Sequence, residues 1–222
     1  MRLLNSRYGI NIEFRENEIN TLIVEKPEFL TDVVQNIMKQ IEGEEGDFVL
    51  SDNTSIKIDK DVVFIVNPFA IDFNNKKIIN RLYEQLSDVG NDYIQEYNQI
   101  NSSIVNTLDK ITNQVSYNNI TYNLEFEWKS LYKLYNVRID DNCSSLFERI
   151  DEYIKILSNV YHSRLVVFLN LKDYLSMEQI QNLKQSCFYY KMHVLLIESV
   201  ERYKSNQENI FVIDKDRCLI VK

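Results

Sequence analysis

The stretch that decides the fold runs from Val62 to Leu82 and reads VVFIVNPFAIDFNNKKIINRL. Val62–Val66 is a continuous apolar run, which is typical of a strand buried on both faces of a sheet. Asn67-Pro68 ends that run, because proline cannot donate to a strand ladder. From Asn74 onward the pattern becomes helical. The chain is therefore expected to leave a buried sheet here and to enter a helical segment.

Apolar residues recur at helical spacing from Asn74 to about Val115. Their steps of three and four form an eleven-residue repeat, close to the natural period of an α-helix. This repeat predicts nearly straight helices and disfavours a left-handed coiled coil. Gly90 and its Asx neighbours favour helix ends, so we expect a break into two helices near Ser87–Asn91. The narrow stripe is typical of an interaction seam, and its members are Ile78, Leu82, Leu86, Val89, Tyr93, Tyr97, Ile100, Ile104, Leu108, Ile111 and Val115.

Strands and capped helices are predicted on both sides of this segment. Pro27 suits a first helical turn and Gly43 suits a C-cap, so we expect a helix over Pro27–Ile41. Capping boxes beginning at Ser145 and Ser176 predict two more helix starts. The expected extended segments are Ile10–Phe14, Thr21–Val24, Phe48–Leu50, Ser55–Ile58, Val62–Val66, Thr121–Phe126, Val137–Ile139, Leu165–Leu169, Val194–Ile197, Ile210–Ile213 and Cys218–Val221, with hairpin turns at Ser51–Thr54 and Asp214–Arg217.

The order of these elements predicts an α/β fold with an insertion. Either α/β portion alone is small and would leave strands of the buried type exposed. We therefore expect one discontinuous α/β head, residues 1–70 plus 162–222, and a helical leg, residues 71–161.

Composition and charge exclude several classes of protein. With 222 residues, 45% hydrophobic and 12% aromatic, the chain is no disordered acidic tail despite its net charge of −8. Its apolar runs are too short to span a membrane, and residues 1–6 turn polar at once, so we expect a cytoplasmic protein without a secretory signal. Cys143, Cys187 and Cys218 form no C-x-x-C pair, so mostly buried, reduced thiols are expected. His162 and His193 are expected at strand boundaries, and a Cys–His nucleophilic pair stays open.

Nucleotide binding is disfavoured at the predicted strand–helix junction Glu25-Lys26-Pro27-Glu28. A phosphate-binding loop needs small residues whose backbone N–H groups approach the phosphates. This junction has no glycine, carries two carboxylates, and loses one donor to proline. We expect no nucleotide there.

Four segments carry a resemblance to a known family: residues 10–34, 65–82, 137–150 and 164–221. The first three read INIEFRENEINTLIVEKPEFLTDVV, IVNPFAIDFNNKKIINRL and VRIDDNCSSLFERI, and the fourth contains RLVVFLN, YLSMEQIQNL, HVLLIES and NIFVIDKDRCLIV. Together they frame nearly the whole chain, which resembles the short-form Csn-type accessory protein of type II-A CRISPR systems.

The resemblance implies a degenerate P-loop-like α/β head without nucleotide chemistry, and a helical leg. It implies a homotetrameric ring whose positively charged channel holds double-stranded DNA. Members of that family bind DNA ends and slide inwards without reading sequence. They act in acquisition of new spacers, together with the CRISPR integrase complex and the effector nuclease. The expected protein is therefore not an enzyme.

Two groups of basic residues are the candidates for DNA binding. Four copies would carry 4 × −8 = −32 charges, so any attraction to phosphate must come from a local field. Contacts from Lys and Arg to phosphate carry no sequence information, which suits a protein that must accept any DNA. One group lies at the start of the first long helix, and the other on and after a short helix: Lys76, Lys77 and Arg81, then Lys129, Lys133 and Arg138.

Calcium is the cofactor that the resemblance implies, held by acidic residues of the leg. Calcium prefers six to eight oxygen ligands, several of them from carboxylates. The corresponding region keeps only Glu125 and Glu127, with Asp140 and Asp141 after the short helix, so we expect at most one weak site.

Two other classes of function stay open at this point. A metal-dependent nuclease would use the same four carboxylates, although the sequence shows no lysine-assisted nuclease signature. A protein-binding scaffold would use the long apolar seam.

Overall fold

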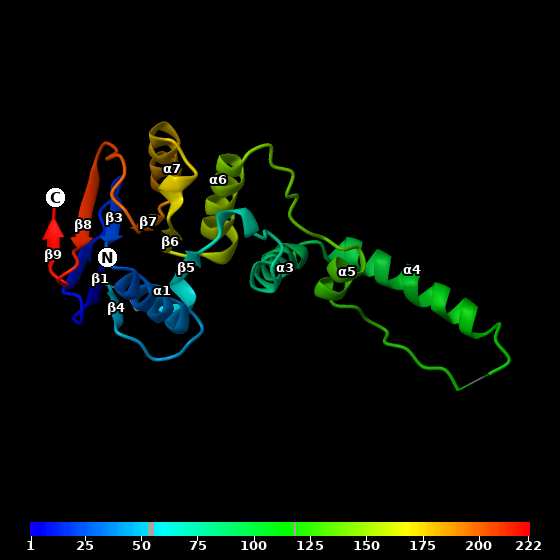
Figure 1. The fold of residues 1–222 in the computed structure, drawn as a ribbon. Helices are drawn as coiled ribbons and strands as arrows, with labels where there is room; N and C mark the ends of the chain where they lie inside the picture. Colours follow the sequence, from blue (N-terminus) through cyan, green and yellow to red (C-terminus); the bar gives the residue numbers. More distant parts are fainter. Residues whose placement is uncertain (53–55, 118) are drawn as a thin grey trace. The chain divides into compact units, whose positions relative to one another are not determined.

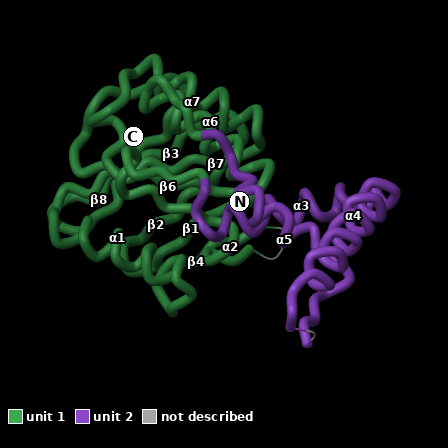
Figure 2. The backbone as a smooth tube through the Cα atoms, turned by 90° about the vertical axis from the view of Figure 1, so that its right-hand side faces the viewer, with its two compact units in different colours: residues 1–73, 141–222 green, residues 74–140 purple. Residues whose placement is uncertain are grey.

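A computed structural model describes residues 1–52, 56–117 and 119–222 (Figure 1). The chain divides into two compact units, residues 1–73 with 141–222, and residues 74–140 (Figure 2). We call them the α/β unit and the helical unit. The second boundary differs from the expected one at residue 161, because helix α6 (Leu146–Ile156) buries Ile150 and Ile154 within the α/β unit.

A six-stranded sheet forms the centre of the α/β unit, in the order β5-β6-β7-β3-β8-β9. The first five strands are parallel and β9 is antiparallel to β8. Strands from both ends of the sequence join in this one mostly parallel sheet, which confirms the α/β fold class. Their bounds are β3 (Ile19–Val24), β5 (Val62–Ile65), β6 (Leu165–Leu169), β7 (His193–Glu198), β8 (Glu208–Ile213) and β9 (Leu219–Val221).

A second, three-stranded antiparallel sheet has the order β2-β1-β4. Its strands are β2 (Ile10–Glu13), β1 (Arg2–Asn5) and β4 (Phe48–Ser51). The sequence did not indicate β1, whose partners come from two separate segments. Of the hairpin expected around Ser51–Thr54, residues 53–55 lie outside the described residues. The strand expected at Ser55–Ile58 is wrong at its end, because Ile58 begins the short helix α2 (Ile58–Asp61).

Helix α1 (Pro27–Ile41) is confirmed as expected, with Pro27 in its first turn. Gly43 follows it at φ +89°, the left-handed conformation that a C-cap glycine adopts at little cost. One apolar core lies between α1, the second sheet and one face of the large sheet. Its fully buried members include Ile12, Leu22 and Val33.

The two predicted capping boxes begin helices as expected. Ser176 caps α7 (Met177–Tyr189), and Gln179 returns the second hydrogen bond of the box. Ser145 caps α6, but the Glu148 carboxylate accepts from the Ser144 N–H at 2.7 Å instead of from Ser145. Short turns of helix lie at η1 (Pro68–Ala70), η2 (Leu157–Tyr161) and η3 (Leu171–Asp173).

The helical unit consists of α3 (Lys76–Gly90), α4 (Ile94–Thr112), α5 (Trp128–Leu134) and the segments that join them. The break after Gly90 confirms the expected division of the long helical stretch. Thr121–Phe126 and Val137–Ile139 join no sheet, although the structure describes every residue of both. Val137 accepts a hydrogen bond from Tyr83 Oη at 2.9 Å, which ties the segment after α5 to α3.

Candidate nucleic-acid interface

The first candidate group lies on helix α3. The Asn75 side chain begins this helix by accepting from the N–H groups of Lys77 and Ile78, at 3.1 and 3.2 Å. Lys76, Lys77 and Arg81 are all exposed. Residues four apart share a helix face, so Lys77 and Arg81 point the same way.

The second candidate group is brought to the first by packing of α5 against α3. Glu84 joins them: its carboxylate lies 3.0 Å from Arg81 Nη1 and 3.6 Å from Lys129 Nζ. Lys133 is exposed one turn after Lys129, and Arg138 is exposed beyond the helix. Glu84 contacts two of the six basic residues, Arg81 and Lys129, and for brevity we call all six together with Glu84 the basic face. All of it belongs to the helical unit.

The formal charge of the chain is unevenly divided. The helical unit carries seven Lys and Arg against eight Asp and Glu, a net −1, so the α/β unit carries the other −7 of the chain's −8. A local attraction to phosphate, as expected from the sequence, is therefore possible on an acidic chain. Most of the excess negative charge lies in the α/β unit, whereas the basic face lies in the helical unit. The ion pairs of Glu84 are about half exposed, so each is worth at most about 1 kcal/mol, and a phosphate can compete for its partners.

The four predicted calcium ligands are all exposed, and they lie before and after helix α5 in the sequence. Glu127 precedes the first residue of α5, and Glu125 lies two residues earlier. Asp140 ends the helical unit and Asp141 resumes the α/β unit. Among the residues described, no three His, Cys, Asp or Glu side chains gather as a metal ion requires. Calcium binding stays a prediction, which calorimetric titration of metal-stripped protein would test.

An open aromatic pocket of about 500 Å³ lies beside the basic face, within the helical unit. Its lining includes Tyr97 from α4, Phe126 from the segment before α5, and Trp128 and Lys129 from α5. The Tyr97 and Phe126 rings have centroids 4.7 Å apart, and each lies 5.7 Å from the Trp128 ring. Sequence reasoning placed Tyr97 in the seam and missed this site, although Trp128 is the only tryptophan of the chain.

The Cys187 thiol is not activated as a nucleophile. Cys187 and His193 line the same pocket of about 320 Å³ in the α/β unit. Burial raises the pKa of the Cys187 thiol to about 12, so this thiol stays protonated near neutral pH. Burial also lowers the pKa of His193. The expectation of mostly buried thiols holds for Cys187, whereas Cys143 is half-buried and Cys218 is exposed.

The junction between β3 and α1 keeps the features that disfavour phosphate. The Glu25 N–H donates to the Ile213 carbonyl at 3.1 Å, so this backbone donor is already used. Glu28 lies in the first turn of α1, where its charge repels an anion. The P-loop-like ancestry of the α/β unit stays a prediction.

No helix in the described parts of the chain has both the length and the apolar character of a membrane span.

Comparison with known proteins gave three findings. The family model described as CRISPR-associated protein Cas_Csn2 matches residues 40–217. The CRISPR-associated protein Csn2 of Streptococcus agalactiae is 23% identical over 165 residues, covering 72% of each protein. The solved structure of cbiO1 from Clostridium perfringens, part of the ABC transporter complex cbiONQ, aligns with 96% of this chain and 79% of its own at a TM-score of 0.44 and 13% identity.

Proposed function

Because the chain belongs to the Csn2 family of CRISPR-associated proteins, we propose that it binds the ends of double-stranded DNA without reading sequence. The role is non-catalytic and lies in CRISPR adaptation, the acquisition of new spacers. Its partners there are the CRISPR integrase complex and the effector nuclease.

The basic face is the observation that supports DNA binding. Lys76, Lys77, Arg81, Lys133 and Arg138 are exposed, and Lys129 is half-exposed, so all six can reach a phosphate. Phosphate contacts of this kind release counterions and supply sequence-independent affinity. The interaction therefore weakens steeply as salt is added.

Helix α4 supports assembly into a homotetramer. None of its residues, all of which the structure describes, is buried. Ile100, Ile104 and Ile111, which share one face of the helix, are instead 37–58% exposed. An exposed apolar stripe of this length is typical of a surface that another protein covers. In the proposed ring, a second copy covers it and the basic faces line the channel.

Gel-shift with linear and closed circular duplexes of equal length tests the function. Retardation of the linear DNA alone is expected, because a ring needs an accessible end. Lys129→Glu with Lys133→Glu should lower the affinity for linear DNA at least about tenfold, since two phosphate contacts become repulsive.

The matched control is Lys204→Glu with Lys215→Glu, which makes the same charge change at exposed positions of the α/β unit. It should retain linear DNA as the parent does. Equal loss in both variants, or unchanged retention by the first, would contradict a role for the basic face. Cleavage of plasmid or linear DNA in magnesium or manganese would instead favour the metal-dependent nuclease.

A further inference from the structure

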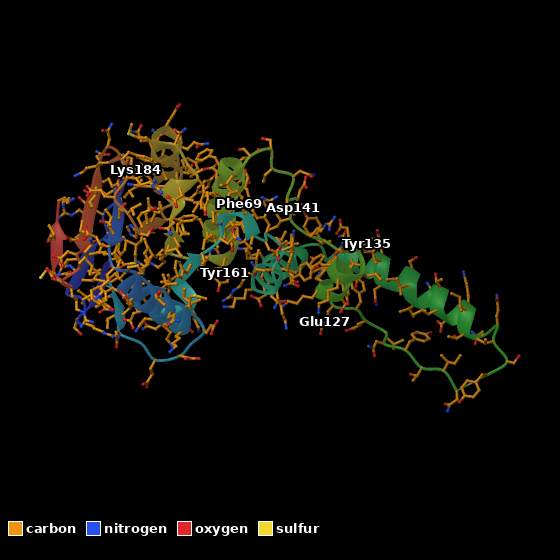
Figure 3. All side chains as sticks on the ribbon, viewed as in Figure 1. Phe69, Glu127, Tyr135, Asp141, Tyr161 and Lys184 are labelled. Atoms are coloured by element: carbon orange, nitrogen blue, oxygen red, sulfur yellow. The ribbon has the colours of Figure 1, made fainter. Side chains whose placement is uncertain are left out.

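The aromatic pocket combines flat apolar surfaces with a charged rim. Tyr97, Phe126 and Trp128 are all half-buried, so each keeps part of its ring open to the pocket. Lys129 lies at the lining and is also a member of the basic face. Glu127 and Asn91 add hydrogen-bonding groups to the same lining. Figure 3 labels Glu127, which immediately precedes α5.

The walls of the pocket are held in place before any ligand arrives. Tyr97 Oη donates to the Phe126 carbonyl at 2.9 Å, which joins α4 to the segment before α5. The Trp128 ring stacks on Tyr132, with centroids 6.1 Å apart and planes 15° apart. Tyr132 Oη in turn donates to the Leu86 carbonyl of α3 at 2.9 Å. Ordered rings of this kind lose little conformational freedom when a ligand stacks on them.

The chemistry of the lining selects a flat, uncharged ring attached to an anion. Every nucleobase has a π-face that stacks on aromatic side chains, whatever its identity. Each of the four DNA bases has at least one N–H group that can donate to the Glu127 carboxylate, and the phosphate that follows can meet Lys129. A ligand with a cationic side chain could stack on the rings and pair with Glu127, but the charge of Lys129 would repel it. A pocket of about 500 Å³ lies within the range of small-molecule sites and has room for one nucleoside.

We propose that this pocket stacks an unpaired base at the end of a DNA duplex, with the phosphate of that base on Lys129. The inference rests on the proposed function and adds a step to it: the protein would distinguish frayed or extended ends from blunt ones without reading sequence.

Trp128, as the only tryptophan, reports on the pocket directly. Three probes are compared: a blunt duplex, the duplex with a short unpaired adenine extension, and the duplex with an abasic extension of equal length. The abasic extension carries the same phosphates without bases. We expect the adenine extension to quench Trp128 emission and to bind about fivefold or more tightly than the abasic one.

Variants of the other two rings separate stacking from folding. Tyr97→Ala and Phe126→Ala should each remove the preference for adenine over abasic extensions while blunt-duplex binding stays. Tyr97→Phe removes the hydrogen bond to the Phe126 carbonyl but keeps the ring on which a base stacks, so it should keep the preference. Tyr135→Ala is the matched control, because Tyr135 is 74% exposed at the far end of α5 and lies outside the lining (Figure 3). If an alanine variant unfolds, the titrations of the wild type and of Tyr97→Phe still test whether the pocket prefers the adenine extension.

Failure of this inference differs from failure of the function. Blunt-duplex binding with equal quenching by adenine and abasic extensions would overturn the pocket and leave the function standing. If the protein did not bind the blunt duplex, the proposed function would be overturned. Single strands with adenine bases and with abasic sites would then be compared, and equal quenching of Trp128 emission by both would overturn the pocket as well. A change in Trp128 emission that follows protein concentration without DNA would assign the pocket to a second copy, and this too would overturn the inference.

Discussion

Lys172 and Glu208 form an ion pair inside the α/β unit, where 5% and 3% of the two residues are exposed. Lys172 Nζ also donates to the Tyr203 carbonyl at 2.9 Å, and Glu208 accepts from the Ser205 N–H at 2.7 Å. Burial acts to raise the pKa of Glu208, but hydrogen bonds from Lys172 and Thr21 outweigh it and hold the pKa below its usual value. A buried pair so fully bonded anchors the segment before β8 to the sheet.

Glu198 beside this pair is predicted to make stability depend on pH. Its Oε1 accepts from the Lys172 N–H at 3.1 Å, and its Oε2 has no hydrogen-bond partner among the described residues. Burial raises the pKa of Glu198 to about 7, from an ordinary value of 4.5. The folded state therefore holds this proton more tightly than the unfolded state does. The stability that this proton contributes to the folded state is fully present below about pH 4.5 and is lost as pH rises through about 7.

Glu198→Gln should remove that loss, because glutamine carries no titrating proton. The free energy of unfolding is measured with urea at about pH 5 and about pH 8. Between these two pH values it should fall by about 2–3 kcal/mol more in the parent than in the variant. Glu45→Gln, at an exposed position, is the control and should behave as the parent does. An identical pH dependence in the parent and Glu198→Gln would contradict the assignment.

At the scale of elements, the packing of α5 against α3 shapes both the basic face and the aromatic pocket. Gly90, the last residue of α3, lies under the Trp128 ring. An ideal Cβ at this position would be 2.9 Å from Trp128 Nε1 and 3.0 Å from Cε2. The first distance is shorter than real Cβ contacts and the second is tighter than most of them, so a side chain there must move the indole or the helix.

Gly90→Ala is therefore expected to destabilise the helical unit by about 1–3 kcal/mol through overpacking. The helix propensity gained by alanine, up to about 1 kcal/mol, offsets part of this cost. The measurement is chemical unfolding followed by Trp128 emission, whose native spectrum should also shift. Asn106→Ala, exposed on α4, supplies the control. Full stability and an unchanged spectrum in Gly90→Ala would show that the contact is looser than described.

For the whole molecule, the apolar stripe of α4 and the division of charge point to assembly. Ile104 and Ile111 are 40% and 58% exposed on a helix that buries nothing within its own chain. Burying such side chains against a second copy contributes about 1.5–3 kcal/mol each when burial is complete. The helical unit, at −1, also meets less self-repulsion on assembly than the α/β unit would at −7.

Light scattering should accordingly give about 106 kDa for the parent, four times 26.5 kDa. Ile104→Glu with Ile111→Glu should lower that mass, because carboxylates in an apolar contact are costly to desolvate. Gln99→Glu with Asn106→Glu adds the same charge on another face of α4 and should leave the mass unchanged. A parent mass of 26.5 kDa would contradict the assembly.

Features with a local cause could be predicted from the sequence. The eleven-residue repeat, Pro27, Gly43 and the serine caps located the helices, because period and capping act within a turn or two of the chain. Continuous apolar runs located the parallel strands, because a strand covered on both faces tolerates few polar residues. The absence of glycine at Glu25–Glu28 needed no structure to be seen.

Features that join distant segments needed the tertiary structure. β1 becomes a strand only because β2 and β4 flank it, and α6 joins the α/β unit only through its packing. The ion pairs of Glu84 join Arg81 on α3 to Lys129 on α5, which lie far apart in sequence. The aromatic pocket likewise brings Tyr97 to Phe126 and Trp128. Local patterns specify which face of an element is apolar, but not which other element that face meets. That choice is made by the packing of the whole chain, which decided the geometry of both candidate sites.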